Sequence, residues 1–315
     1  MDNEQVSETT QEAEPVMSRE AAPSQSAAAV ASPKKRGWIV AIVALIVVLG
    51  LGITGIVSCS NLVFKLWSAA GVVPWDSEET YGPSTIGVIR LEGSMEFDGS
   101  ASSTSGFTSL LDKAAADNKI KAIVLYVNSG GGYSTVGEEM VEALRKFEKP
   151  VVVYCSAICA SAAYEVSSQA DYIIAAKTSQ IGGIGSSLLF EDYSDYYDSQ
   201  GIRLEYIVSA PSKDATYGNR PLTDEERAHF QAMINEINDV FVAYVAEGRN
   251  MTLAKAKSLA NGLVYAGNTA KSKGLIDDTG TFDDALAKAA ELAQIEAGSY
   301  DTVELNDYLY TYYIY

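Results

Sequence analysis

Ser161 lies in a run of small and apolar residues from Cys155 to Tyr164, downstream of a glycine-rich segment, Asn128 to Gly132. A serine among alanines is a candidate nucleophile if a helix begins there, because helix-terminal amides stabilise a developing oxyanion. Such a serine still needs a base that removes its proton. The residues therefore indicate covalent catalysis by a serine with a partner located elsewhere in the chain.

The base has few candidates, because His229 is the chain's one histidine. It follows the charged segment Thr223 to Arg227, which is typical of the first turns of a helix, and we expect it to be exposed. A Ser-His-Asp triad is therefore not expected. A lysine can also activate a serine, and Lys213, in a loop after the predicted apolar strand Tyr206 to Val208, is our candidate. An ordinary solvated lysine is the alternative for this position.

Four segments carry a resemblance to a known family. From about residue 86 to residue 290 the chain resembles signal peptide peptidase A, a Ser-Lys membrane protease related in fold to the Clp protease proteolytic subunit and to crotonases. The matching segments are Asn128 to Gly132, Ala160 to Tyr164, Ile181 to Gly185 and Ser209 to Asp214.

The resemblance implies a role for each matched residue. Ser161 corresponds to the nucleophile and Lys213 to the base, while the backbone N–H groups of Gly131 and Ala162 correspond to oxyanion donors. It implies no cofactor. An ordinary strand-to-helix turn is the alternative for the glycine segment.

The chain departs from the family pattern at several positions, where Gly130 replaces proline, Ala162 and Ala163 replace glycines, Glu165 replaces an aromatic residue and Gly183 replaces a serine. In the family that serine is expected to hydrogen-bond the lysine. The candidate substitutes here are Ser186, Ser187 and Ser212. Burial must also favour the neutral form of Lys213, so Asp214 and Glu165 must point away from its amine.

The hydrophobic pattern predicts an α/β fold. Strands are expected at 86–91, 122–127, 151–154 and 172–175, and helices at 109–117, 137–147, after Ser161, at 223–247 and from about Thr252 and Phe282. Alternating strands and helices indicate a largely parallel sheet. Thr223 followed by Glu226 has the form of a capping box. The resemblance further implies the Clp/crotonase-like spiral of βα units.

The chain divides into five predicted regions: a disordered tail (1–33), a transmembrane anchor (34–64), a linker (65–84), the Ser-Lys protease domain (85–295) and a Tyr-rich C-terminal tail (296–315). The anchor is uncharged after its basic start and long enough to cross a bilayer. The basic residues before it predict a cytoplasmic N-terminus and an extracytoplasmic catalytic domain. The alternative is a cleaved, lipid-modified N-terminus at Cys59.

The net charge of −18 argues against nucleic acid as a partner. The cysteines and the histidine lack metal-ligand spacing, and buried thiols are the default for Cys155 and Cys159. The resemblance implies a homo-oligomeric ring at the membrane that cleaves remnant signal peptides, with the serine and lysine of one site supplied by neighbouring protomers. The Tyr-rich tail is an edge-pairing or disordered segment, or an autoinhibitory one. A catalytically inactive scaffold and a crotonase-type acyl-CoA enzyme are the other functional classes.

Overall fold

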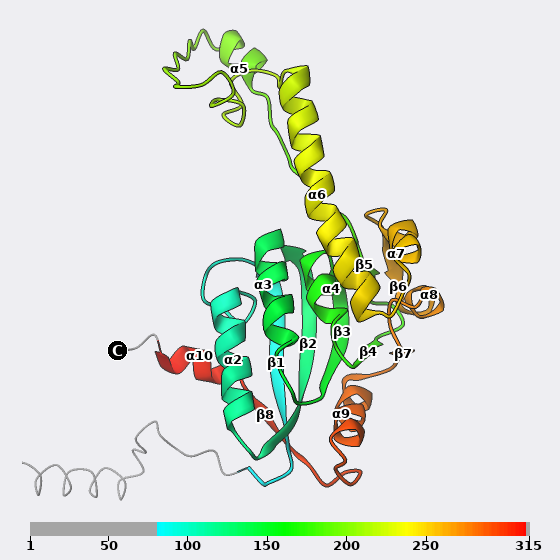
Figure 1. Cartoon of the computed structure of the whole chain (residues 1–315). Coiled ribbons are helices and arrows are strands. Elements are labelled where there is room, and N and C mark those ends of the chain that lie inside the picture. Colours follow the sequence, from blue (N-terminus) through cyan, green and yellow to red (C-terminus); the bar gives the residue numbers. More distant parts are fainter. Residues whose placement is uncertain (1–80, 313–315) are drawn as a thin grey trace, which may run out of the picture. The chain divides into compact units, whose positions relative to one another are not determined.

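A computed structural model of the 315-residue chain describes residues 81–312. Its centre is an eight-stranded sheet (Figure 1). The strands are β1 (Thr85–Met95), β2 (Ile120–Gly132), β3 (Val151–Ala160), β4 (Tyr172–Ala175), β5 (Gln180–Gly182), β6 (Val264–Ala266), β7 (Asp278–Thr279) and β8 (Asp301–Glu304). The helices are α2 (Thr104–Ala116), α3 (Ser134–Leu144), α4 (Ala162–Ser167), α5 (Ser194–Ser199), α6 (Asp224–Gly248), α7 (Leu253–Leu259), α8 (Gly267–Lys273), α9 (Phe282–Leu292) and α10 (Asp307–Tyr312).

The sheet is almost entirely parallel. Its main path runs β6-β5-β3-β2-β1-β8, and β4 pairs with both β3 and β7. Only β5 and β6 pair in the antiparallel direction among the described strands. β3 pairs first with β4, from Val152 to Cys155, and then with β5, from Ile158 to Ala160. This change of partner brings the ends of β2, β3 and β5 together where α4 begins.

Both faces of the sheet are buried, as expected for parallel strands. Side chains of β2 alternate between the two faces, so that Ile123 and Leu125 lie in one apolar cluster and Val124 in the other. The larger cluster includes buried residues of α2, α3, α4 and α6, and the smaller one those of α9. The predicted α/β fold with a largely parallel sheet is therefore confirmed.

Local sequence signals account for several helix starts. Thr223 accepts a hydrogen bond from the Glu226 N–H at 3.2 Å, and its own N–H donates to the Glu226 carboxylate at 2.9 Å. The predicted capping box is confirmed, and α6 begins at the next residue. The Thr252 side chain caps α7 in the same way, by accepting from the Lys255 N–H.

Two local predictions are wrong. The segment from Tyr206 to Val208 is not a strand: it has no partner strand in the described part of the chain, and Ile207 is 98% exposed. High strand propensity does not form a strand without a neighbour to complete the ladder. The glycine segment is not a turn, because Gly131 and Gly132 continue β2 and pair with Ser94 and Met95 of β1.

The C-terminal segment belongs partly to the sheet. β8 pairs in parallel with the first residues of β1, and Val303 and Leu305 are buried. The pairing residues precede the tyrosine cluster, whose first members lie in the helix α10 instead of a strand. No described residue of the segment lines the cavity at Ser161 described below. The segment adds a strand at the β1 edge of the sheet (Figure 1).

Within residues 81–312, no helix is both long enough and apolar enough to cross a membrane. The predicted tail, the anchor and nearly all of the linker lie outside the described residues, as does Cys59. The membrane anchor and its orientation stay predictions.

Candidate active site

Ser161 lies at the junction between β3 and α4 in a backbone conformation unusual for a residue other than glycine. Its φ is 54° and its ψ is −135°, outside the regions that a side chain normally allows. Its N–H donates to the carbonyl of Gly182 at 2.9 Å, and its carbonyl accepts from the N–H groups of Tyr164 and Glu165 at 2.9 and 3.0 Å. The serine is therefore fixed from both sides while its side chain remains half-exposed.

Gly131 brings the main chain of β2 against this serine. A Cβ at Gly131 would lie 2.7 Å from the Ser161 Cβ and 2.8 Å from the Ala162 nitrogen, and the φ of Gly131 is +93°. Both the space and the conformation therefore require glycine. The structure thus brings three of the four predicted site residues together: Ser161, Gly131 and Ala162.

The two predicted oxyanion donors differ in whether their N–H groups already have an acceptor. Ala162 is the first residue of α4, where helix geometry provides no acceptor for its N–H. The N–H of Gly131 donates to the Ser129 hydroxyl at 3.1 Å. Gly131 would have to exchange this partner for the substrate oxygen, whereas Ala162 is available without rearrangement. The geometry supports Ala162 more directly than Gly131.

A cavity of about 300 Å³ opens beside Ser161. Its lining combines hydroxyls of Ser134, Thr135, Ser161 and Ser186, apolar side chains of Met233, Ile237, Val240 and Phe241, and carboxyls of Glu138, Glu165 and Glu236, together with Ala162 and Gly185. The apolar wall comes from α6, from Met233 to Phe241, whereas the carboxyls come from α3, α4 and α6. This is a concave site with the candidate nucleophile at its edge.

Glu165, which the sequence marked only as a departure from the family pattern, lines this cavity. It is 4% exposed, and no hydrogen bond or ion pair to its carboxyl is found within the described residues. Burial, with a smaller contribution from the charge of Glu138, raises its pKa to about 8. The available signal was a glutamate within the otherwise apolar and small-residue segment that follows the serine.

Lys213 is not brought to Ser161 within one chain. It is exposed, its N–H donates to the Ala210 carbonyl at 3.1 Å, and it does not line the cavity. Its loop is attached at Glu226 in the first turn of α6, whereas the first α6 residue that lines the cavity is Met233, seven residues further along. That separation is about 10 Å along the helix axis at the usual rise of 1.5 Å per residue. The predicted dyad therefore stays a prediction.

An ion-pair network holds the Lys213 loop to α6. Arg220 contacts the carboxylates of Asp214 and Glu226 at 2.7 and 2.8 Å. These contacts hold the pKa of Asp214 below its usual range and that of Glu226 well below it, chiefly through the hydrogen bonds from Arg220. The acid next to Lys213 in sequence is thus engaged by Arg220, as the predicted dyad requires.

Of the hydroxyls suggested as replacements for the missing serine, only Ser186 lines the cavity. Ser187 is exposed, and the Ser212 side chain hydrogen-bonds Glu226. Gly183 lies against Ser161, since a Cβ there would be 3.3 Å from the Ser161 nitrogen at a φ of +57°. His229 is exposed on α6, as predicted, and lies outside the cavity lining. Cys155 and Cys159 are buried free thiols, also as predicted.

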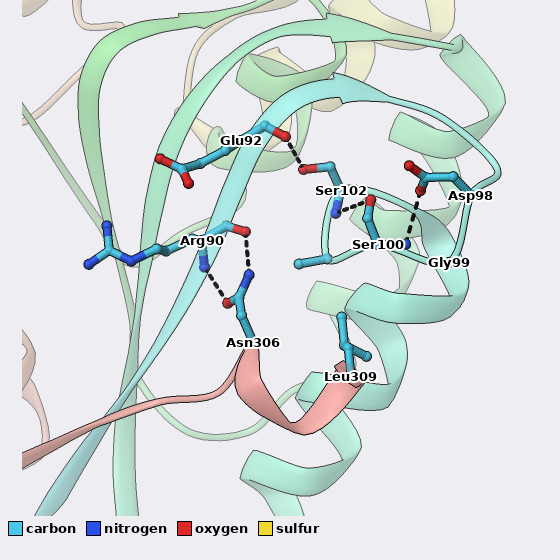
Figure 2. A pocket seen from close by; sticks show the side chains of 9 residues that line it. Arg90, Glu92, Asp98, Gly99, Ser100, Ser102, Asn306 and Leu309 are labelled. Carbon is cyan, nitrogen blue, oxygen red and sulfur yellow. Dashed lines mark hydrogen bonds between the residues drawn. The ribbon is translucent and has the colours of Figure 1, made fainter. Parts of the chain in front are cut away.

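A second cavity, of about 340 Å³, lies between β1, the loop before α2 and the C-terminal segment (Figure 2). There Asn306 accepts from the Arg90 N–H at 2.8 Å and donates to the Arg90 carbonyl at 3.0 Å. The Arg90 guanidinium in turn makes two hydrogen bonds to Glu304. Asn306 thereby extends the pairing of β1 beyond β8. We assign this cavity a structural role, because its polar groups hydrogen-bond one another and attach the C-terminal segment to β1.

Comparison with known proteins gives matches to two family models. The model of peptidase family S49 matches residues 143–296, and the Clp protease model matches residues 97–181. The second match agrees with the parallel α/β sheet and supports a Clp-protease-like fold.

Similar proteins cover most of the described region. A "putative protease" of Methanocaldococcus jannaschii is 40% identical over 192 residues, covering 60% of this chain and 61% of that protein. A "putative protease" of Synechocystis is 31% identical over 196 residues, covering 62% and 70%. A "putative signal peptide peptidase SppA" of Enterococcus faecium is 32% identical over 183 residues, covering 57% and 53%.

The chain spans 61% of the archaeal relative and 53% of the Enterococcus relative, so it matches only part of each. The S49 model covers the serine, the Lys213 loop and α6. The Synechocystis match covers more than two thirds of that relative at 31% identity. The chain therefore belongs to peptidase family S49, the family of signal peptide peptidase A.

Proposed function

We propose that the protein is a serine endopeptidase with Ser161 as its nucleophile. The observation that carries this is the fixed, strained backbone of Ser161 beside a cavity, with the main chain of Gly131 and Ala162 against it. In the proposed reaction the Ser161 oxygen attacks a peptide carbonyl, and the N–H groups of Ala162 and Gly131 stabilise the oxyanion. Collapse of this intermediate breaks the peptide C–N bond, and the amine leaves with the proton that the base took from Ser161. Water then hydrolyses the acyl-enzyme ester, which releases the second product and restores the serine.

Lys213 is the proposed base, supplied by a neighbouring copy of the chain. A lysine acts as a base only as the neutral amine, and removal from water favours that neutral form. Packing of one subunit's Lys213 loop over the cavity of the next would provide that burial. The distance along α6 within one subunit supports a partner as the source.

The segment from residue 186 to residue 223, which we call the arm, supports such assembly. It lies at the N-terminal end of α6, away from the sheet (Figure 1). Phe190 contacts Phe230 of α6 with ring centroids 4.7 Å apart, so the arm is attached to the helix. Its exposed apolar residues include Leu188, Leu189, Tyr196, Ile202, Leu204, Ile207 and Tyr217. An apolar surface of this kind is typical of an interface between subunits.

The proposed substrates are remnant signal peptides and other unfolded or membrane-released peptides. The name of the Enterococcus relative and the apolar segment predicted at residues 34–64 support this choice. The protein would be a single-pass membrane protein with a cytoplasmic N-terminus and an extracytoplasmic catalytic ring. An inactive membrane-anchored scaffold is the second candidate, favoured by the position of Lys213 outside the cavity.

The test uses the full chain in detergent micelles and an unfolded protein substrate. Ser161→Ala and Lys213→Ala should each abolish hydrolysis, while Lys255→Ala, which removes an exposed lysine on α7, should not. Mixing the two inactive variants under conditions that exchange subunits should restore part of the activity, because some sites then combine an intact serine with an intact lysine. Hydrolysis that survives in Ser161→Ala would refute the proposal. Inactive wild type that assembles normally and fails to react with a fluorophosphonate at Ser161 would favour the scaffold.

A further inference from the structure

The cavity at Ser161 has an unusual combination of charge and burial. Its three carboxyls come from three different helices, with Glu138 on α3, Glu165 on α4 and Glu236 on α6. Within the described part of the chain, no lysine, arginine or histidine lines this cavity. Burial and the neighbouring negative charge disfavour the ionised form of the innermost acid, and a cationic group that entered the cavity would favour it.

Glu165 is the central member of this group. Only 4% of Glu165 is exposed, whereas Glu138 and Glu236 are exposed and lie at the rim of the cavity. Its carboxyl lies over α3, because a Cβ on Gly137 would be 2.8 Å from the Glu165 Oε2. No hydrogen bond or ion pair to this carboxyl is found among residues 81–312. The carboxyl lines the cavity and keeps contact with solvent there, so a cationic group that enters the cavity can reach it and supply the partner that a largely buried acid otherwise lacks.

We propose that this cavity is a specificity pocket for a lysine or arginine side chain of the substrate, with Glu165 as the residue that binds its cationic end. This inference rests on the proposed peptidase function. The apolar wall formed by Ile237, Val240 and Phe241 would contact the aliphatic part of such a side chain. The pocket adjoins the nucleophile, so the residue that it binds would lie next to the bond that is cut.

The protonation of Glu165 fits this role. In the unliganded protein, burial and the facing Glu138 favour its neutral form at pH 7. A bound lysine or arginine would favour the carboxylate, and binding would release a proton into solution. The preference for a basic side chain should therefore strengthen as the pH rises through about 8. Glu138 on α3 and Glu236 on α6 are the other charged groups that face the cavity, and both add to the attraction.

The experiment compares two peptides that differ only at the residue before the cut, one with lysine and the other with norleucine, which has nearly the same shape and no charge. Full-length wild type should hydrolyse the lysine peptide with a kcat/KM higher by about tenfold or more, the scale expected for a buried charge pair. Glu165→Gln should reduce the ratio to within about twofold of one. Glu139→Gln is the matched control, since it removes the same charge from an exposed position on α3 outside this cavity.

The ratio of the two peptides cancels effects on the base and on acylation, because both reactions use the same Ser161. A ratio near or below one in wild type, with hydrolysis that depends on Ser161, would overturn the specificity proposal and leave the peptidase function intact. An equal change of both rates in Glu165→Gln would also overturn it, because Glu165 would then act on the catalytic groups.

Binding separates the two proposals if hydrolysis fails. Ser161→Ala retains the pocket, so fluorescence anisotropy should detect tighter binding of the lysine peptide than of the norleucine peptide. Adding Glu165→Gln to this variant should remove the difference. Charge-selective binding without any turnover would support the pocket and refute the peptidase function. Equal binding of the two peptides would overturn the pocket.

Discussion

Ser161 shows how much of the fold is needed to present a single hydroxyl. A residue other than glycine in such a conformation costs about 1–3 kcal/mol, which the surrounding structure must offset. Three backbone hydrogen bonds to β5 and α4 fix it, and the absence of a side chain at Gly131 leaves room for it. These contacts hold the strained backbone of Ser161 beside the cavity in the unliganded chain.

The burial of Glu165 can be tested through the pH dependence of folding stability, without any measurement of activity. Its pKa rises from an ordinary value of 4.5 to about 8 on folding. Between these values the unfolded chain has released the proton while the folded chain retains it, so the stability contributed by this group falls as the pH rises. Above about 8 both states are ionised and the loss is complete.

Glu165→Gln should therefore become progressively more stable than wild type between pH 5 and pH 8, by up to a few kcal/mol, and the difference should level off at higher pH. Chemical denaturation at several pH values measures this. Glu139→Gln should give a difference that does not change with pH in this way. If the stability difference between Glu165→Gln and wild type did not change with pH, the Glu165 carboxyl would be solvated in the folded wild-type protein.

The sequence indicated the candidate nucleophile but not the pocket, for physical reasons. A serine between small residues at a strand end is a local pattern, so Ser161 could be predicted from its neighbours. The pocket depends on α3, α4 and α6 converging, and residues 138, 165 and 236 become neighbours only in the folded chain. The position of Lys213 likewise depends on how the arm packs on α6, which no local pattern determines.

At the scale of elements, the sheet edge formed by β8 shows how a short strand is retained. β8 has four residues, and its ladder with β1 continues through the Leu305 N–H, which donates to Val88 at 2.8 Å, and then through the Asn306 side chain. A side-chain amide thus replaces a backbone group where the strand has ended. The strands and helices with clear periodicity were predictable, whereas this substitution was not, because it depends on a contact across 216 positions.

Asn306→Ala should weaken this edge. It removes two hydrogen bonds to Arg90 and should lower the free energy of unfolding by about 1–3 kcal/mol, since typical bonds of this kind contribute about 1 kcal/mol each. Amide hydrogen exchange should report faster exchange at Leu305 than in wild type. Asn118→Ala, at an exposed loop position, should change neither quantity. Unchanged exchange at Leu305 would mean that β8 holds its edge without the asparagine.

At the scale of the whole molecule, the arm exposes apolar side chains that one subunit leaves uncovered. Leu189 and Ile207 are 85% and 98% exposed. The predicted strand at Tyr206 to Val208 reflects real strand propensity, but the described chain offers it no partner. Predictions from one sequence cannot include a surface that a second molecule would complete.

Substituting both residues, Leu189→Lys and Ile207→Lys, should leave the subunit folded because neither side chain is buried. The charges should prevent subunit contact, so light scattering should report a smaller assembly and hydrolysis of an unfolded protein should fall at least tenfold, with the circular dichroism spectrum unchanged. Leu253→Lys, at a half-exposed position on α7, is the control. If the double variant formed an assembly of the same mass as wild type and had the same activity, the arm would be excluded as the interface between subunits.

α6 is continuous from Asp224 to Gly248 and contains neither proline nor an internal glycine before its last residue. One rigid rod therefore carries the arm at one end and a wall of the cavity at the other. We expect the two events at its ends to be thermodynamically linked: a peptide that fills the cavity should favour assembly by the same factor by which assembly favours peptide binding. The peptide would then act as an allosteric effector of its own enzyme.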